Sequence, residues 1–268
     1  MPNINVNGLD LFYTEQGSGD ETLVFGHGLL MDTSMWDAVV PQFTNQYRVI
    51  CFDFRGQGKT GDPGHGYDID NLVKDTVAFI QAISTKPVHY VGLSMGGMVG
   101  LPLAARHPDL LRSLVLLDTS AQAEPWWNKI KYAIMTLIVN IFGVKPLVPA
   151  MLPLMFGKST LNNPAKREMI SCWKQKLLAL KKTIVGPVSG VTKRRDVTKE
   201  LDKISSPTLM IVGDEDQTTP LSCAQNIAAH IANAELKIIP QCGHSSALEK
   251  PDAVVDLMKI FYAKPDRT

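Results

Sequence analysis

The sequence carries almost no net charge and few cysteines. Its 27 Lys and Arg residues nearly cancel its 26 Asp and Glu residues, which leaves a formal charge of +1. Nucleic-acid binding requires a basic excess or stripe, and we interpret the one compact basic run, at 193–195, as a solvated turn. Cys51, Cys172, Cys223 and Cys242 show no Cys-x-x-Cys spacing. We therefore expect free thiols of a reducing compartment, no metal site and no nucleic-acid partner.

Targeting and membrane-spanning segments are missing as well. The residues that follow Met1 lack the basic start and the apolar stretch of a signal peptide. The apolar run from Tyr132 to Val144 is too short to cross a bilayer, and prolines interrupt its continuation. These absences predict a cytoplasmic location without stable membrane insertion.

The sequence does contain a regular alternation of short apolar runs and longer segments of helical period. The first two runs flank Asn7-Gly8, a pair typical of a tight antiparallel hairpin. The later runs are almost continuously apolar, as expected for strands covered on both faces of a parallel sheet. The predicted strands are Asn3–Val6, Leu9–Glu15, Thr22–Phe25, Arg48–Phe52, Val88–Gly92, Leu114–Leu117, Thr208–Val212 and Leu236–Ile239.

Helices are predicted between these strands. One apolar face repeats from Leu72 to Ile83, with Asp70 as its expected N-cap. Further helices are predicted over Met95–Arg106, Leu221–Ile231 and Asp252–Tyr262. Strands that alternate with helices imply an α/β fold with a mostly parallel central sheet and helices on both faces.

The alternation breaks once, where no strand is convincing. We interpret residues 120–204 as a helical cap inserted between two parts of the core, residues 1–119 and 205–268. The cap contains Trp126, Trp127 and Trp173 and a long apolar run. Its apolar face could pack on the core, line an apolar substrate pocket, or do both. On the second interpretation, Trp126 and Trp127 are candidate pocket residues.

A Gly-x-Ser-x-Gly string supplies the candidate nucleophile, Ser94. The apolar strand over 88–91 runs directly into Gly92-Leu93-Ser94-Met95-Gly96, and a helical stretch follows. A serine on such a sharp strand-to-helix turn needs small residues two positions away on either side, because its strained backbone brings those positions together. The turn also directs a helix N-terminus at the serine, which favours a developing oxyanion.

A serine hydroxyl needs an adjacent base, and His244 is the best placed of six histidines. It follows the last predicted strand, beside the flexible Gly243, at the edge where parallel sheets build their sites. A carboxylate must hold the imidazole in the correct tautomer. Asp214, Glu215 and Asp216 follow one strand and Asp118 follows another, so the residues alone leave the acid open.

The order of these groups and several local strings resemble the α/β-hydrolase superfamily. Gly26-His27-Gly28-Leu29 resembles its oxyanion loop, the loop that begins at Asp53 resembles the one after its fourth strand, and Gly213-x-x-Asp216 resembles its acid loop. The resemblance implies a triad of Ser94, Asp216 and His244. It also implies an oxyanion hole formed by the backbone N–H groups of Leu29 and Met95, and a bracing role for Asp53 and Arg55.

Within the superfamily, the stretches Gly92–Gly97, Leu114–Ser120 (leading toward Trp126-Trp127) and Pro207–Pro220 resemble 3-oxoadipate enol-lactonases and related small carboxylesterases. We therefore expect a Ser-His-Asp hydrolase, without cofactor or metal, that cleaves small-molecule esters or lactones with small to medium apolar acyl groups through an acyl-enzyme. Two alternatives stay open. One is an enol-lactonase-like activity, for which Arg194 and Arg195 are the only candidate carboxylate ligands in the cap. The other is a ligand sensor that retains a triad and signals through a partner protein.

Overall fold

A single sheet of eight strands organises the structure, which is a computed structural model that describes residues 2–232 and 234–264. The strand order is β1-β2-β4-β3-β5-β6-β7-β8. Pairs β1·β2 and β2·β4 are antiparallel, and all the others are parallel. Every predicted strand is present, and several extend a few residues past the predicted bounds: β1 (Asn3–Val6), β2 (Leu9–Gln16), β3 (Glu21–Gly26), β4 (Tyr47–Phe52), β5 (Val88–Leu93), β6 (Leu111–Leu117), β7 (Thr208–Gly213) and β8 (Ala234–Ile239).

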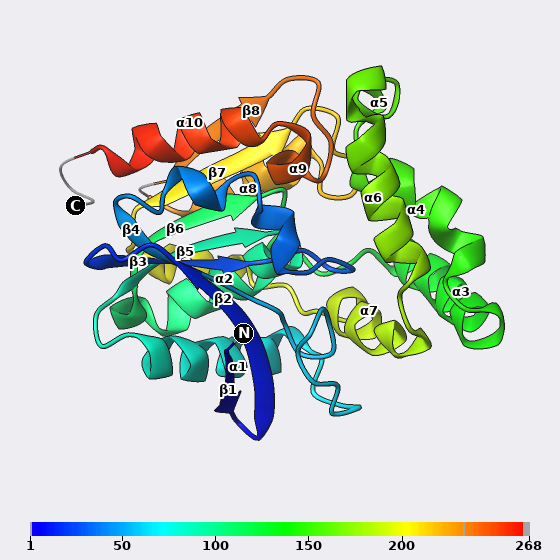
Figure 1. Cartoon of the computed structure of the whole chain (residues 1–268), viewed down its shortest axis with the longest axis horizontal. Helices are drawn as coiled ribbons and strands as arrows, with labels where there is room; N and C mark the ends of the chain where they lie inside the picture. The colour runs from blue at the N-terminus through cyan, green and yellow to red at the C-terminus, as the bar shows by residue number, and fades with distance from the viewer. Residues whose placement is uncertain (1, 233, 265–268) are drawn as a thin grey trace.

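Helices cover both faces of this sheet (Figure 1). One core layer joins the sheet to α1 (Ile69–Ile83), α2 (Met95–Arg106) and α8 (Leu221–His230). The other joins it to α10 (Pro251–Tyr262) and to the cap. Successive residues of a strand point to opposite faces, so Leu23 and Phe25 of β3 enter the second layer while Val24 enters the first. The prediction of a mostly parallel sheet with helices on both faces is confirmed.

The start of α1 corrects one prediction. The N-cap is Asp68, whose side chain accepts a hydrogen bond from the N–H of Asn71 at 3.0 Å. Asp70 lies inside the first turn and forms an ion pair with Arg106 at 2.7 Å. Two acids separated by one residue are equally good caps by type, and the backbone of Asp68 is the extended one that a cap requires.

The chain between β6 and β7 folds as helices, and no strand occurs in this fully described segment. Figure 1 shows these helices gathered beyond the end of the sheet toward which the parallel strands point. Within residues 2–232 and 234–264, no helix is long and apolar enough to cross a membrane. The main helices of the segment are α3 (Trp126–Phe142), α4 (Val148–Met155), α5 (Lys158–Leu161), α6 (Arg167–Leu178) and α7 (Val185–Thr192).

Candidate active site

Ser94 occupies a strained turn between β5 and α2. Its backbone has φ +50° and ψ −110°, outside the regions that residues with a side chain ordinarily adopt. The turn is so tight that a Cβ at Gly92 would lie 2.4 Å from the carbonyl carbon of Gly96, and one at Gly96 would lie 2.3 Å from the carbonyl oxygen of Gly26. Glycine is therefore required at both positions. Strain of this kind costs about 1–3 kcal/mol and concentrates at functional sites.

The three predicted triad residues form one chain of hydrogen bonds. The Nε2 atom of His244 lies 2.8 Å from the Oγ atom of Ser94, and the Nδ1 atom lies 2.9 Å from an Oδ2 oxygen of Asp216. All three residues are buried, and they come from the ends of three different strands. The hydroxyl, the imidazole and the carboxylate thus have the relative positions that nucleophile, base and orienting acid require.

The Asp216 carboxylate is held by its own loop. One oxygen accepts the N–H groups of Thr218 and Thr219 at 2.8 and 3.0 Å, and the other accepts the Thr219 hydroxyl at 2.8 Å. Burial opposes the ionised form, but the His244 imidazole and these donors outweigh it and keep the pKa of Asp216 below its ordinary value. Burial likewise opposes the imidazolium of His244, but the Asp216 carboxylate raises the pKa of His244 above its ordinary value.

The other candidate acids have different partners. Asp214 accepts the N–H of Cys242, and Glu215 accepts the N–H and hydroxyl of Ser159 in the cap. The Asp118 oxygens accept the N–H groups of Gly213 and Ser246 at 3.1 and 3.0 Å rather than the imidazole. Burial, followed by the nearby Asp216 charge, raises the pKa of Asp118 to about 8. Among the described residues, the carboxylate of Asp216 is the only carboxylate that forms a hydrogen bond with His244.

Of the two predicted oxyanion donors, Met95 follows Ser94 in the chain, and Leu29 lies on the distant loop after β3. Met95 is the first residue of α2, so its N–H has no intrahelical partner, and Leu29 lines the pocket beside Ser94. The N–H groups of the next residue after each of them are already hydrogen-bonded to other partners. The Gly96 N–H bonds the His27 carbonyl at 3.1 Å, and the Leu30 N–H bonds the Gln57 side chain at 2.9 Å. Within the described part of the chain, the N–H groups of Leu29 and Met95 have no hydrogen-bond partner.

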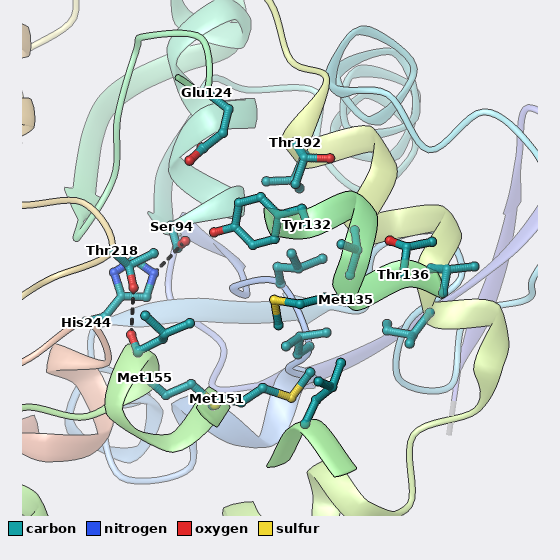
Figure 2. Close-up of a pocket in the computed structure, with 18 of the residues that line it drawn as sticks. Ser94, Glu124, Tyr132, Met135, Thr136, Met151, Met155, Thr192, Thr218 and His244 are labelled. Atoms are coloured by element: carbon teal, nitrogen blue, oxygen red, sulfur yellow. Dashed lines mark hydrogen bonds between the residues drawn. The ribbon is translucent and has the colours of Figure 1, made fainter. Parts of the chain in front are cut away.

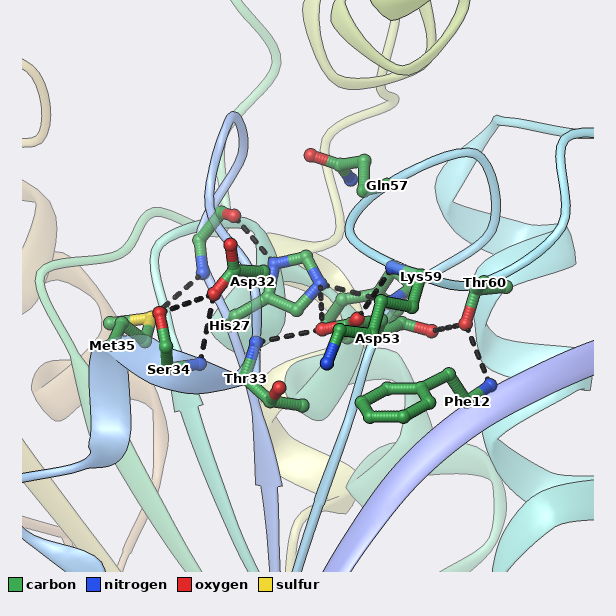
Figure 3. A network of polar contacts seen from close by, with 12 residues as sticks. Phe12, His27, Asp32, Thr33, Ser34, Met35, Asp53, Gln57, Lys59 and Thr60 are labelled. Atoms are coloured by element: carbon green, nitrogen blue, oxygen red, sulfur yellow. Dashed lines mark hydrogen bonds and ion pairs between the residues drawn. The ribbon is translucent and has the colours of Figure 1, made fainter. Parts of the chain in front are cut away.

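A buried polar network supports the oxyanion loop (Figure 3). The Nδ1–H of His27 donates to the Gly28 carbonyl at 2.7 Å, and Nε2 accepts the Phe54 N–H at 2.9 Å. Because Nε2 accepts this N–H group, the ring is in its neutral form, and burial, which lowers the pKa of His27, acts in the same direction. Asp53 accepts the N–H groups of Thr33 and Lys59 at 2.7 and 2.8 Å.

The expected bracing by Arg55 takes a different route. Its guanidinium pairs with Asp75 of α1 at 2.7 Å and therefore ties the loop after β4 to a helix of the core. Neither Arg55 nor Asp75 lines the pocket that contains Ser94 and His244.

Comparison with known proteins decides the family. The family described as the alpha/beta hydrolase fold matches residues 21–143 and 173–251. The chain belongs to this family. It is 26% identical over 247 residues to 3-oxoadipate enol-lactonase 2 of Acinetobacter baylyi, covering 91% of this chain and 89% of that protein.

Two solved structures resemble this α/β-hydrolase over nearly its whole length. The enol-lactonase of Burkholderia xenovorans aligns with a TM-score of 0.90 and 25% identity over 98% of this chain and all of that one. A thermophilic esterase of Thermogutta terrifontis aligns with a TM-score of 0.90 and 26% identity over 99% and 97%. The resemblance inferred from the motifs is confirmed, and these relatives support hydrolysis as the general activity.

The pocket of this α/β-hydrolase lies between the candidate triad and the cap. Ser94 and His244 occupy one end, and most of the wall consists of aliphatic and methionine side chains. Figure 2 shows Tyr132 and Met135 of α3 projecting into the pocket opposite Met151 of α4. The site is therefore an apolar cavity with its reactive groups at one end, the usual form of a small-molecule site.

Trp126 and Trp127 do not line this pocket, contrary to the prediction. They lie in the first turn of α3 with 68% and 59% of their surface exposed. The third cap tryptophan, Trp173, is buried in the core layer between cap and sheet and does not line the pocket either. The composition shows that the cap is apolar, but α3 carries apolar residues on more than one face. Only the packing shows which of these residues line the pocket and which are exposed.

One charged pair enters the pocket wall. Arg194 and Glu124 both line it and lie 2.8 Å apart, with largely buried side chains. Arg194 also donates to the carbonyl oxygens of Gln122 and Val191 at 2.9 and 3.1 Å. The other arginine considered, Arg195, lies outside this pocket and pairs with Asp70 of α1 and with Glu200.

Glu249 is a supporting residue that the sequence reasoning missed. Its carboxylate is fully buried and accepts the N–H groups of Gly243 and Ser245, at 3.0 and 3.1 Å, on either side of His244. It also accepts the N–H of Gly157 in the cap at 2.9 Å. Glu249 therefore joins the histidine loop to the cap. Glu249 is followed by a lysine and a proline, a local sequence typical of an exposed position, so the sequence gives no indication of its buried role.

Proposed function

We propose that this chain is a serine hydrolase that cleaves carboxylic esters or lactones with small to medium apolar acyl groups. The observation that carries the proposal is the hydrogen-bonded series Ser94, His244 and Asp216 at the end of an apolar pocket. The enol-lactonase and esterase relatives support the same reaction class.

The proposed reaction has two halves. In the first, Nε2 of His244 takes the Ser94 proton while Oγ bonds to the substrate carbonyl carbon, and the N–H groups of Leu29 and Met95 stabilise the oxyanion. The imidazolium then protonates the departing alkoxide, which leaves an acyl-enzyme. In the second half, His244 deprotonates a water that attacks the acyl carbon, and protonated Ser94 and the carboxylic acid are released.

The charge balance of the pocket supports neutral acyl groups. Glu124 forms an ion pair with Arg194, the cation in the pocket wall, through Nη1, and the Nε and Nη1 groups of Arg194 also donate to two backbone carbonyls. A substrate carboxylate would have to share the Arg194 charge with Glu124, at the cost of like-charge repulsion, or lie unpaired in an apolar cavity, and both cost free energy. An enol-lactone acid, the substrate class suggested by two relatives, is the alternative this arrangement disfavours.

A labelling experiment tests the nucleophile. A fluorophosphonate probe should modify Ser94 alone, as mapped by peptide mass spectrometry. Ser94→Ala should lose both the label and, by the scale of triad knockouts, about six orders of magnitude in kcat. Ser120→Ala removes another buried hydroxyl, one outside this pocket, and should keep label and activity. Activity lost together with a label on a different serine would refute the assignment.

A matched substrate series tests the specificity. Across p-nitrophenyl esters from acetate to octanoate, kcat/KM should rise by at most about fourfold per methylene until the pocket is full. A carboxylate-bearing ester and an enol-lactone acid should be poor substrates. A marked preference for either charged substrate would instead favour an enol-lactonase-like function.

A further inference from the structure

Helix α3 exposes a continuous apolar face. Six of its large side chains have between 53% and 68% of their surface in solvent: Trp126, Trp127, Ile130, Ile134, Leu137 and Ile141. At about 100° per residue, these six positions fall within one arc of about 100°. Scattered exposed apolar residues are ordinary on a protein surface, whereas a contiguous stripe of this kind marks a surface that contacts something else.

The other side of the same helix serves the pocket. Tyr132, Met135, Thr136 and Val139 line it, and their positions on the helix are roughly opposite the exposed stripe. Because a helix with its side chains is about 10 Å across, whatever contacts the exposed stripe lies about one helix diameter from the catalytic pocket. Helix α3 therefore separates the pocket from solvent, with one side lining the pocket and the exposed stripe on the opposite side.

Charge distinguishes between the possible occupants of this face. Lys129 and Lys131 are exposed on either side of the stripe, and α3 contains no Asp or Glu. Pairing with a second copy through a two-fold axis would bring these lysines toward those of the partner. Lysines flanking a stripe of Trp, Ile and Leu are instead the composition of helices that lie in the headgroup region of anionic membranes.

We propose that the exposed stripe of α3 docks reversibly on an anionic phospholipid surface, with the helix axis parallel to it. The apolar side chains would enter the acyl boundary, and the two lysines would contact phosphate groups. This contact places the pocket beside the lipid, so that a membrane-dissolved ester could reach Ser94. The docking does not depend on the proposed function, whereas the delivery of such an ester does.

Cosedimentation with vesicles tests the docking. The Ser94→Ala protein should bind vesicles of phosphatidylcholine with phosphatidylglycerol, bind phosphatidylcholine alone more weakly, and dissociate as salt is raised. The combined variant Ile130→Gln, Ile134→Gln, Leu137→Gln keeps good helix formers on the exposed face. It should lower the partition coefficient on the order of 100-fold, about fivefold for each half-exposed side chain.

The chain offers a matched control at Ile260. This α10 residue is 60% exposed but lies outside the cap, so Ile260→Gln should bind vesicles like the unchanged protein. Unaltered vesicle binding by the triple variant would overturn the proposal. So would a protein that ignores vesicles but forms a dimer that the triple variant abolishes, because the occupant would then be a second copy.

Tryptophan fluorescence reports the docked face directly. Of the four tryptophans, Trp36 and Trp173 are buried, so Trp126 and Trp127 dominate any response to lipid. Emission should shift to shorter wavelength on anionic vesicles and should not shift when both exposed tryptophans are replaced by phenylalanine. An unmoved spectrum in the unchanged protein would contradict docking through α3.

Activity measurements separate this proposal from the proposed function. The triple variant should hydrolyse a soluble short-chain ester normally, because none of its three positions lines the pocket. It should hydrolyse an ester dispersed in anionic vesicles more slowly, in proportion to its lost binding. Vesicle binding by a protein that labels on no serine would sustain the docking and refute the proposed function, and normal labelling without binding would do the reverse.

Discussion

The substitution Asp216→Asn tests the candidate triad most sharply, because it exchanges one oxygen for an NH2 group of similar size. The Oδ1 oxygen of Asp216 accepts two backbone N–H groups, from Thr218 and Thr219. Since these donors cannot reverse, the amide oxygen of asparagine must stay with them. The NH2 group then takes the position of Oδ2, which is 2.9 Å from Nδ1 of His244.

This exchange forces the imidazole into the wrong tautomer. The new NH2 donates to Nδ1, so the ring proton moves to Nε2 and faces the Oγ atom of Ser94, 2.8 Å away. His244 can then no longer accept the serine proton. On the scale of this substitution in other triads, kcat should fall about 10⁴-fold, or about 5.4 kcal/mol in the barrier. The fold should survive, because the Thr219 hydroxyl can rotate to accept from the NH2 group.

The measurement compares Asp216→Asn with Asp118→Asn. Both kcat on p-nitrophenyl butyrate and the free energy of unfolding should be determined for each variant. Asp118 accepts two backbone N–H groups and no imidazole proton. Its replacement should cost about 1–3 kcal/mol of stability, because one N–H loses its acceptor, with a much smaller loss of kcat. Greater loss of activity in a folded Asp118→Asn protein would refute this reasoning.

Three further predictions follow from the charged groups around the site. Activity should fall as the pH is lowered through the pKa of His244, because the imidazolium cannot accept a proton. That pKa is raised, so the midpoint of the pH–kcat/KM profile should lie above about 6.5, the ordinary histidine value. Glu249→Gln should lower kcat by about 10- to 100-fold, because the histidine loop would be displaced. It should also shift the midpoint of the pH profile downward, because the Glu249 charge helps to raise the pKa of His244. An unchanged midpoint would show that Glu249 has only a structural role. Glu124→Gln should release Arg194 and raise kcat/KM for a carboxylate-bearing ester about tenfold or more while neutral esters change little, and no gain in the substrate series would show that this pair does not set specificity.

The sheet and the turn at the nucleophile could be predicted from local features of the sequence. Strands covered on both faces must be apolar at consecutive positions, so β3 to β7 could be recognised without knowledge of their partners. The turn at Ser94 leaves no room for a Cβ two residues away on either side, which makes its glycines a strong local signal. Each of these constraints acts between residues that are close in the chain, so it can be recognised from the sequence alone.

Which of several chemically equivalent residues contacts a given partner depends on long-range packing, and the sequence does not show it. Asp214, Glu215 and Asp216 are neighbours of similar chemistry, and only the direction of each side chain gives one of them to His244. The tryptophans of α3 were misplaced for a related reason. Hydrophobic periodicity reports which residues share a face but not what covers that face, and in α3 one apolar side lines the pocket while the other meets solvent. Which side of α3 lines the pocket is determined by its packing against residues distant in the chain.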